Sequence, residues 1–183
     1  MIFGFFNRRR GEVAAPLYSS IVAQARQTSF YRDWSVPDTV DGRFEMVVLH
    51  LVLVTERLRG PHRAISPIAQ DLFDFFLLDM DRSLREMGVG DLSVPKRMKK
   101  IGEAVYGRFD AFGPLLETGD GEALAKAIER NMFPETSEPE ASERIAAYAI
   151  SAFARLASQA TSDIEAGRIS WPDPTATQEG QTG

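Results

Sequence analysis

Side chains that could do acid–base or metal chemistry are few in this sequence, and they lie apart. The 183 residues include two histidines, His50 and His62, and no cysteine, which excludes disulfides and thiolate chemistry. Neither histidine is paired with an acidic residue at a spacing typical of metal ligands. The carboxylates from Asp71 to Asp81 could transfer protons, but helical spacing spreads them along an outward face. The sequence therefore predicts a protein that is not an enzyme and uses no cofactor or metal.

The charged residues indicate binding chemistry instead, because four cations fall within five consecutive residues. They are Lys96, Arg97, Lys99 and Lys100. A helix is predicted to start near Ser93 or Pro95. The dipole of a helix disfavours cations in its first turn by about 0.3–1 kcal/mol each. Two interpretations stay open: a basic turn that binds a partner, or a charged face that contacts only water.

An apolar pair interrupts the polar face of the preceding helix, which is predicted from Ser66 to about Met87. Apolar residues at spacings of three and four form the buried stripe of this helix, but Phe75 and Leu78 fall among the charges on the other side. A second element of the same domain could cover this pair. Alternatively, the pair is an exposed apolar spot rimmed by charge, which is typical of a partner site.

Residues 1–14 combine apolar and basic side chains, in an order that a secretory signal does not have, because the charges follow the apolar run. The apolar run is also too short to span a bilayer. Aromatic rings beside arginines could lie in a membrane interface, with the arginines on anionic headgroups, and the alternative is a frayed terminus. The residues concerned are Phe3, Phe5, Phe6, Arg8, Arg9 and Arg10.

Helical periodicity accounts for most of the other apolar residues, so the predicted fold class is all-α. The most hydrophobic stretch, residues 41–58, has almost no polar face and is predicted to be the buried central helix of a single compact domain. That domain is expected to span residues 15–172, with flexible termini and a disordered tail at 173–183. Further helices are expected at about 15–27, 66–87, 93–112, 121–131 and 137–159, and an aromatic connector that packs on the core at 30–34.

Local signals predict two boundaries and one buried polar group. His50 lies in the middle of the apolar helix, so it is predicted to be a hydrogen-bonded core residue rather than a ligand. Gly113-Pro114 is predicted to break or kink the helix that precedes it. Ser137, with Glu140 three residues later, matches a capping box and predicts a helix start at that point.

Composition sets the class of protein. With 44% apolar and 26% charged residues, the chain is typical of a globular domain that is large enough to bury a core. A net charge of −5 argues against general nucleic-acid binding, and so against DNA as a partner. The absence of cysteine agrees with a reducing compartment, and a cytoplasmic location is expected.

Three stretches of the sequence resemble the ubiquinol–cytochrome c chaperone family. They are LYSSIVAQAR, FYRDWSVPDTVDGRFEMVVLH and, above all, DLFDFFLLDMDRSLREMGVGDLSVPKRMKKIGEAVYGR. The resemblance runs from about Leu17 to Trp171-Pro172. It implies an all-helical assembly factor for respiratory complex III. Mitochondrial members of the family bind newly made cytochrome b and work with a small partner protein near the ribosome exit. The short start of this chain resembles bacterial members, and the cytochrome b role is the part that carries over.

The resemblance and the residues together predict a chaperone at the inner face of a bacterial inner membrane. It is expected to hold cytochrome b, or another complex III subunit, until the other subunits assemble. Phe75 and Leu78 are expected to contact apolar client surface, and the Lys96–Lys100 turn to contact acidic client groups or lipid. The alternative is a membrane- or ribosome-associated adaptor that binds anionic lipid or RNA through the same cations, with a binding strength that falls steeply with salt.

Overall fold

The computed structural model describes residues 3–175, with side chains from residue 13 on except that of residue 61, and all regular secondary structure in this part is helical. No strand occurs in these residues, and the predicted all-α class is confirmed. The elements are α1 (Phe3–Ala25), α2 (Thr28–Arg32), α3 (Val40–Arg57), the 3-10 helix η1 (Pro61–Arg63), α4 (Pro67–Glu86), α5 (Val94–Thr118), α6 (Gly121–Met132), α7 (Pro139–Ala157) and α8 (Thr161–Glu165).

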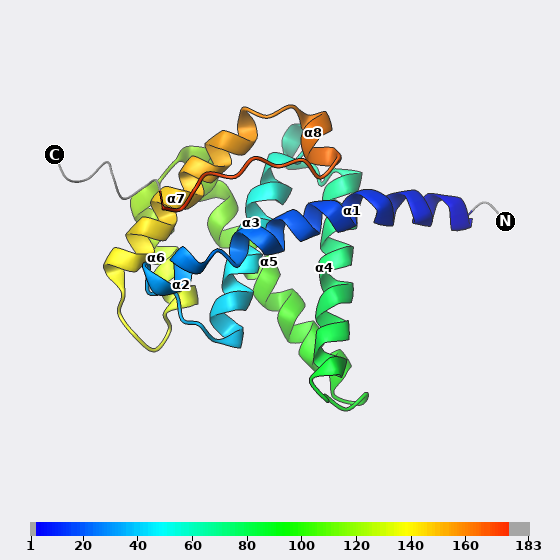
Figure 1. Cartoon of the computed structure of the whole chain (residues 1–183), viewed down its shortest axis with the longest axis horizontal. Coiled ribbons are helices and arrows are strands. Elements are labelled where there is room, and N and C mark those ends of the chain that lie inside the picture. Colours follow the sequence, from blue (N-terminus) through cyan, green and yellow to red (C-terminus); the bar gives the residue numbers. More distant parts are fainter. Residues whose placement is uncertain (1–2, 176–183) are drawn as a thin grey trace.

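Helix α3 is the centre around which the other helices pack (Figure 1). Every residue from Glu45 to Glu56 is buried, and α1, α4, α5, α6 and α7 all contact this helix. Thr39 begins it, because the Thr39 side chain accepts a hydrogen bond from the backbone N–H of Gly42 at 3.1 Å. The predicted central helix is confirmed, with bounds within one residue of those expected.

Helices α4 and α5 form a hairpin whose turn extends beyond the other helices (Figure 1). Ser66 caps α4 by accepting a hydrogen bond from the N–H of Ala69 at 3.3 Å, and Pro67 is the first helical residue, as predicted. Gly88 ends α4 in a left-handed conformation with φ 81°. The N–H of Val89 then donates to the carbonyl of Leu84 at 3.0 Å, so the last turn of α4 is closed by a Schellman motif.

Helix α1 is longer than predicted, because it begins at Phe3 rather than near Ala15 and continues through Pro16. Among the side chains described from residue 13 on, the large buried apolar residues of this helix begin at Leu17, so the sequence pattern underestimates its length. The predicted membrane-contact side chains at residues 3–10 lie outside the described part of the structure.

Two other boundary predictions differ from the structure, which has no break at Gly113-Pro114 and no cap at Ser137. Gly113-Pro114 does not end α5, which runs on to Thr118. Pro114 lies on an exposed face, where water can satisfy the carbonyl that loses its N–H partner. Ser137 does not cap α7, because the helix begins at Pro139 and the Ser137 hydroxyl donates to Glu129 Oε1 at 3.0 Å instead. Proline is favoured at the first helical position, where no N–H is required, and here it sets the start.

The C-terminal segment after α8 runs back over the body of the protein (Figure 1). Trp171 packs against the core, and its indole N–H donates to the hydroxyl of Ser20 at 3.0 Å. The Gln24 side chain donates to the carbonyl of Pro172 at 3.1 Å. The predicted disordered tail lies outside the described residues from position 176 onward.

The aromatic connector predicted at residues 30–34 is mostly the short helix α2, and it packs on the core as expected. Phe30 and Trp34 are buried, with their rings edge-to-face at 5.2 Å between centroids. Both rings also contact Tyr148 of α7. Among residues 3–175, no helix is long and apolar enough to cross a membrane.

Candidate functional site

The four cations of the predicted basic turn lie together on the first turns of α5, at the end of the α4–α5 hairpin. All four side chains are exposed. The first turn of α5 contains no acidic residue, and Ser93 makes no side-chain cap. The Nζ atom of Lys99 lies 3.7 Å from Oε1 of Glu103, and both side chains are well exposed. This pair therefore contributes little to stability. The positive end of the α5 dipole lies at these cations, so both contribute positive potential that is directed at solvent.

Apolar side chains that the sequence analysis missed lie beside these cations. Leu92, in the turn of the hairpin, is 99% exposed, and Met87 at the end of α4 is 60% exposed. We call residues 87–100, which carry these side chains and the four cations, the hairpin tip. A leucine directly after the turn residues Gly88-Val89-Gly90-Asp91 was a readable signal, because turns usually carry small or polar residues. The hairpin tip therefore offers apolar and positive groups on a projecting element.

The structure separates the predicted apolar pair on α4. Phe75 packs against Tyr18 of α1, with ring centroids 5.4 Å apart, so a second element of the domain covers it. Leu78 is 66% exposed. Leu78 precedes Met87 by nine residues, or about 13 Å along the helix at 1.5 Å per residue. Nine residues at 3.6 per turn also place Leu78 and Met87 on opposite faces of α4, so Leu78 is an exposed apolar residue apart from the hairpin tip, whereas most of Phe75 belongs to the α1–α4 contact.

His50 belongs to a buried hydrogen-bond network and is a core residue, as predicted. Its Nδ1 lies 2.8 Å from the Met46 carbonyl, which can only accept, so Nδ1 carries the proton. Nε2 therefore accepts a hydrogen bond from the Tyr148 hydroxyl at 2.9 Å, and that hydroxyl accepts one from Gln24 at 2.9 Å. Burial lowers the pKa of His50 to about 4 and raises the pKa of Tyr148. The neutral side chains of Gln24, His50 and Tyr148 thus join α1, α3 and α7 in one hydrogen-bond network.

Both ends of α3 carry a buried carboxylate that is paired with arginine. Glu45 accepts hydrogen bonds from Nε and Nη2 of Arg108 on α5, at 3.0 and 2.5 Å. Burial raises the pKa of Glu45, and the adjacent guanidinium opposes this shift. At the other end, Glu56 Oε2 accepts hydrogen bonds from Arg59 at 2.7 Å and from Arg63 at 3.0 Å. These pairs fix the position of α3 against α5 and against the η1 loop.

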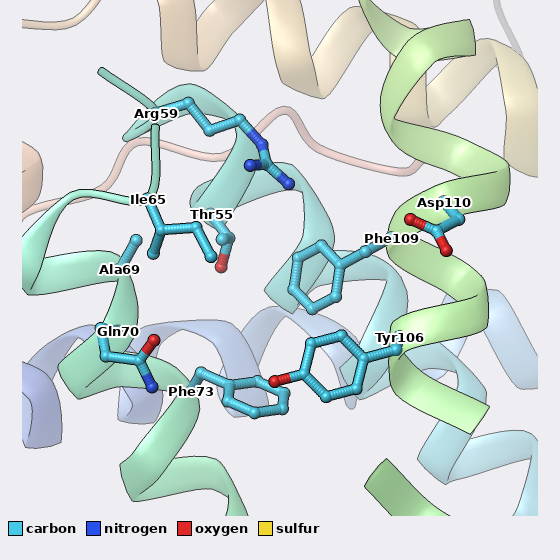
Figure 2. A pocket seen from close by; sticks show the side chains of 9 residues that line it. All are labelled: Thr55, Arg59, Ile65, Ala69, Gln70, Phe73, Tyr106, Phe109 and Asp110. Carbon is cyan, nitrogen blue, oxygen red and sulfur yellow. The ribbon is translucent and has the colours of Figure 1, made fainter. Parts of the chain in front are cut away.

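A cavity of about 220 Å³ lies between α3, the first turns of α4 and the second half of α5 (Figure 2). Thr55 lines its α3 side, and the rings of Phe73, Tyr106 and Phe109 line the side formed by α4 and α5. No sequence pattern pointed to this cavity, because its walls come from three separate helices. Among the described residues, no cluster of three or more His, Asp or Glu side chains could hold a metal ion.

Comparisons with known proteins agree on the family. Residues 32–171 match the family described as ubiquinol-cytochrome C chaperone. The crystal structure of the Cbp3 homolog from Brucella abortus is similar, with a TM-score of 0.81 and 39% sequence identity, over 96% of this chain and 98% of that chain. None of the curated proteins matches the chain. The family match runs from the last residue of α2 to the C-terminal segment and includes the hairpin tip and the cavity. The chain therefore belongs to the ubiquinol–cytochrome c chaperone family.

Proposed function

We propose that the protein is an assembly chaperone for ubiquinol–cytochrome c reductase, respiratory complex III, and that its client is newly made cytochrome b. The observation that carries this proposal is the family match over residues 32–171. The 39% identity with the Cbp3 homolog from Brucella abortus, over nearly the full length of both chains, supports it. Another subunit of complex III is the alternative client within the same function.

The hairpin tip is the surface that we assign to client binding. Leu92 of the hairpin tip is exposed, and so is Leu78 further along α4, while an integral membrane client exposes apolar surface before it is assembled. The four exposed cations near Leu92 can meet acidic groups on client loops or anionic lipid headgroups, and the exposed Lys99–Glu103 pair opposes this little. A projecting hairpin that combines both kinds of group can hold such a client at the membrane surface.

Deletion of the gene tests the proposed function. Assembled complex III and its cytochrome b should fall, while the other respiratory complexes stay at wild-type levels. Blue-native electrophoresis and the haem b absorbance of isolated membranes measure both quantities. Normal complex III in the deletion strain would show that the proposal is wrong.

A charge reversal tests the hairpin tip. In the variant Lys96→Glu, Lys99→Glu and Lys100→Glu, complex III assembly should fail although the protein stays folded. Replacing Lys96 with an acid at the helix N-terminus should stabilise α5 by about 0.3–1 kcal/mol. Loss of the exposed Lys99–Glu103 pair and new repulsion should offset about 0.2–0.5 kcal/mol per pair. The melting temperature should therefore stay close to that of the wild type.

A matched control separates the position of the charges from their number. Lys126→Glu, Arg130→Glu and Arg144→Glu change the net charge equally, on exposed positions of α6 and α7. This control should support complex III assembly. If both triple variants assemble complex III normally, or both fail, the hairpin tip has no special role.

We propose further that the protein is peripheral at the cytoplasmic face of a bacterial inner membrane and that residues 1–10 contribute to this contact. Removal of residues 1–10 should then release the protein from anionic vesicles, since one short apolar and basic segment gives reversible binding. The fold should remain, because Leu17 and Ile21, which anchor α1 in the core, are retained. Equal vesicle sedimentation of the full-length and shortened chains would contradict this role.

A second candidate function is a membrane- or ribosome-associated adaptor that binds anionic lipid or RNA through the four exposed cations. Salt distinguishes the two functions. Phosphate-driven binding that neutralises four charges should weaken with a log–log slope of about −3 to −4 against salt concentration. Client binding through the leucines of the hairpin should depend on salt much less.

A further inference from the structure

The cavity between α3, α4 and α5 contains a buried hydroxyl that lacks a partner. Thr55 is only 4% exposed, and its Oγ1 has no hydrogen-bond partner in the structure. Threonine in a helix commonly donates to the carbonyl one turn earlier, but Thr55 does not. Figure 2 shows this hydroxyl directed into the cavity, which it helps to line. A buried hydroxyl without a partner is unfavourable, and a guest with a polar atom can satisfy it.

The walls of the cavity suit an aromatic ring. Phe73 and Phe109 are buried and lie edge-to-face, with centroids 6.2 Å apart. Tyr106 packs against Phe73 at 5.3 Å and is 57% exposed, and Ile65 on the other side is 54% exposed. These two partly exposed side chains mark the mouth of the cavity at the surface (Figure 2). Aromatic rings pack favourably in such edge-to-face surroundings.

Size and charge restrict the guest further. The volume of about 220 Å³ lies below the range of about 300–1,000 Å³ that is usual for sites of drug-sized ligands and cofactors. The Arg59 guanidinium at the wall is already bound to Glu56 at 2.7 Å and to the Arg63 carbonyl at 2.8 Å. Arg59 and Asp110 are the two charged residues of the lining and carry opposite charges, so the lining has no net formal charge. These properties fit one neutral aromatic side chain with a polar tip.

We propose that this cavity is a docking pocket for one tyrosine or tryptophan side chain of the client polypeptide, with its O–H or N–H bonded to Thr55 Oγ1. Tyrosine and tryptophan are the residues that most often anchor interfaces by filling such pockets. The identity of the polypeptide rests on the proposed chaperone function, whereas the binding of the ring itself does not. The pocket lies between the arms of the hairpin that carries the exposed tip, so both surfaces can contact one client.

The first experiment measures ring binding on the full chain. We use p-cresol and 3-methylindole as probes of the two side chains and toluene as the apolar control, followed by ¹⁵N–¹H NMR. The two polar probes should give saturable shifts at the pocket residues, with dissociation constants on the order of millimolar. Absence of shifts at these residues, or shifts spread over the surface, would overturn the pocket.

Variants of the lining test the mechanism. Thr55→Val keeps the shape and removes the hydroxyl, so p-cresol should bind about three- to tenfold more weakly while toluene changes less than about twofold. The variant should melt no lower than the wild type, because it removes a buried group that lacks a partner. Equal loss for both probes, or no loss for p-cresol, would overturn the assignment of Thr55.

A filled pocket tests the docking role in cells. Ala69→Leu extends a buried side chain into the cavity and should abolish probe binding, whereas Ala147→Leu on an exposed face of α7 should not. If the pocket receives the client, folded Ala69→Leu protein should fail to support complex III assembly and the control should succeed. Full assembly with a blocked pocket would overturn the docking role alone. Normal complex III in the gene deletion would instead overturn the proposed function, with probe binding unaffected.

Discussion

The buried network around His50 predicts a specific dependence of stability on pH. His50 is completely buried, and burial lowers its pKa from 6.5 to about 4. The unfolded chain therefore binds a proton below pH 6.5, while the folded chain stays neutral down to about pH 4. The stability that the neutral histidine contributes is fully present above pH 6.5 and is lost as the pH falls through this window.

The magnitude follows from the difference between the two pKa values. Each pH unit inside the window lowers the free energy of unfolding by about 1.4 kcal/mol. Between pH 7 and pH 5 the loss from His50 is thus about 2 kcal/mol, and it reaches about 3 kcal/mol near pH 4. Glu45 contributes with the opposite sign, because its raised pKa lets the folded state take up a proton first. The contribution of His50 is therefore isolated as a difference between variants.

The assay compares urea denaturation at pH 7 and pH 5 for the wild type and for His50→Gln. The variant should lower stability at pH 7, since the amide cannot reproduce both bonds of the imidazole. Its loss between pH 7 and pH 5 should be smaller than that of the wild type by about 2 kcal/mol. His62→Asn is the matched control, because His62 is exposed and adopts φ 56°, a conformation that asparagine tolerates. The control should keep the pH dependence of the wild type.

The same pH dependence in the wild type and in His50→Gln would refute this reasoning. An NMR titration gives an independent answer, because the imidazole signals of His50 should show no protonation above pH 5 in the folded protein. Titration of His50 near pH 6.5 would mean that water reaches the network. The hydrogen bonds from Tyr148 and to Met46 could not then be permanent.

Two further predictions concern the packing of α3. In Gly42→Ala the new Cβ would lie 2.0 Å from the Pro37 carbonyl oxygen, so the turn before α3 must move and unfolding in urea should show a loss of about 1–4 kcal/mol. Gly102→Ala, in open space on α5, is the control and should gain about 0.5–1 kcal/mol, and a similar loss at both sites would exclude the clash. Arg108→Met leaves the buried Glu45 carboxylate without its guanidinium and should cost about 3 kcal/mol at pH 7. Addition of Glu45→Met should recover most of this, and failure to recover would mean that Arg108 acts through packing.

The sequence predicted those features of the fold that depend on neighbours along the chain. The apolar run of α3 and the cap at Ser66 gave helix bounds that the structure confirms. Both signals depend only on residues that are close together in the sequence. His50 was correctly placed in the core by the apolar residues around it. The exposure of the four cations on α5 also follows from helical spacing, but whether they bind a client stays a prediction.

The features that the sequence missed depend on tertiary contacts. Gly113 was interpreted as a helix breaker, but a Cβ at this position would lie 2.9 Å from Cδ of Glu56, so the glycine lets α5 approach the buried carboxylate. The contact between Phe75 and Tyr18 joins residues of different helices. The pocket around Thr55 needs three helices at fixed distances. Such information lies in the packing of elements rather than in the periodicity of any one of them.

The segment that ends at Pro172 has a consequence for the time at which the protein becomes functional. Gln24 and Ser20 of α1 form hydrogen bonds with Pro172 and Trp171, about 150 residues later in the chain. A ribosome releases α1 long before it releases this segment. The hydrogen bonds of Gln24 and Ser20 to Pro172 and Trp171 therefore form only at the end of synthesis. The completed domain can form only after synthesis has passed Trp171. Truncated or stalled chains should therefore be incompletely folded and sensitive to proteases. Only the chain that includes this segment should form the working protein.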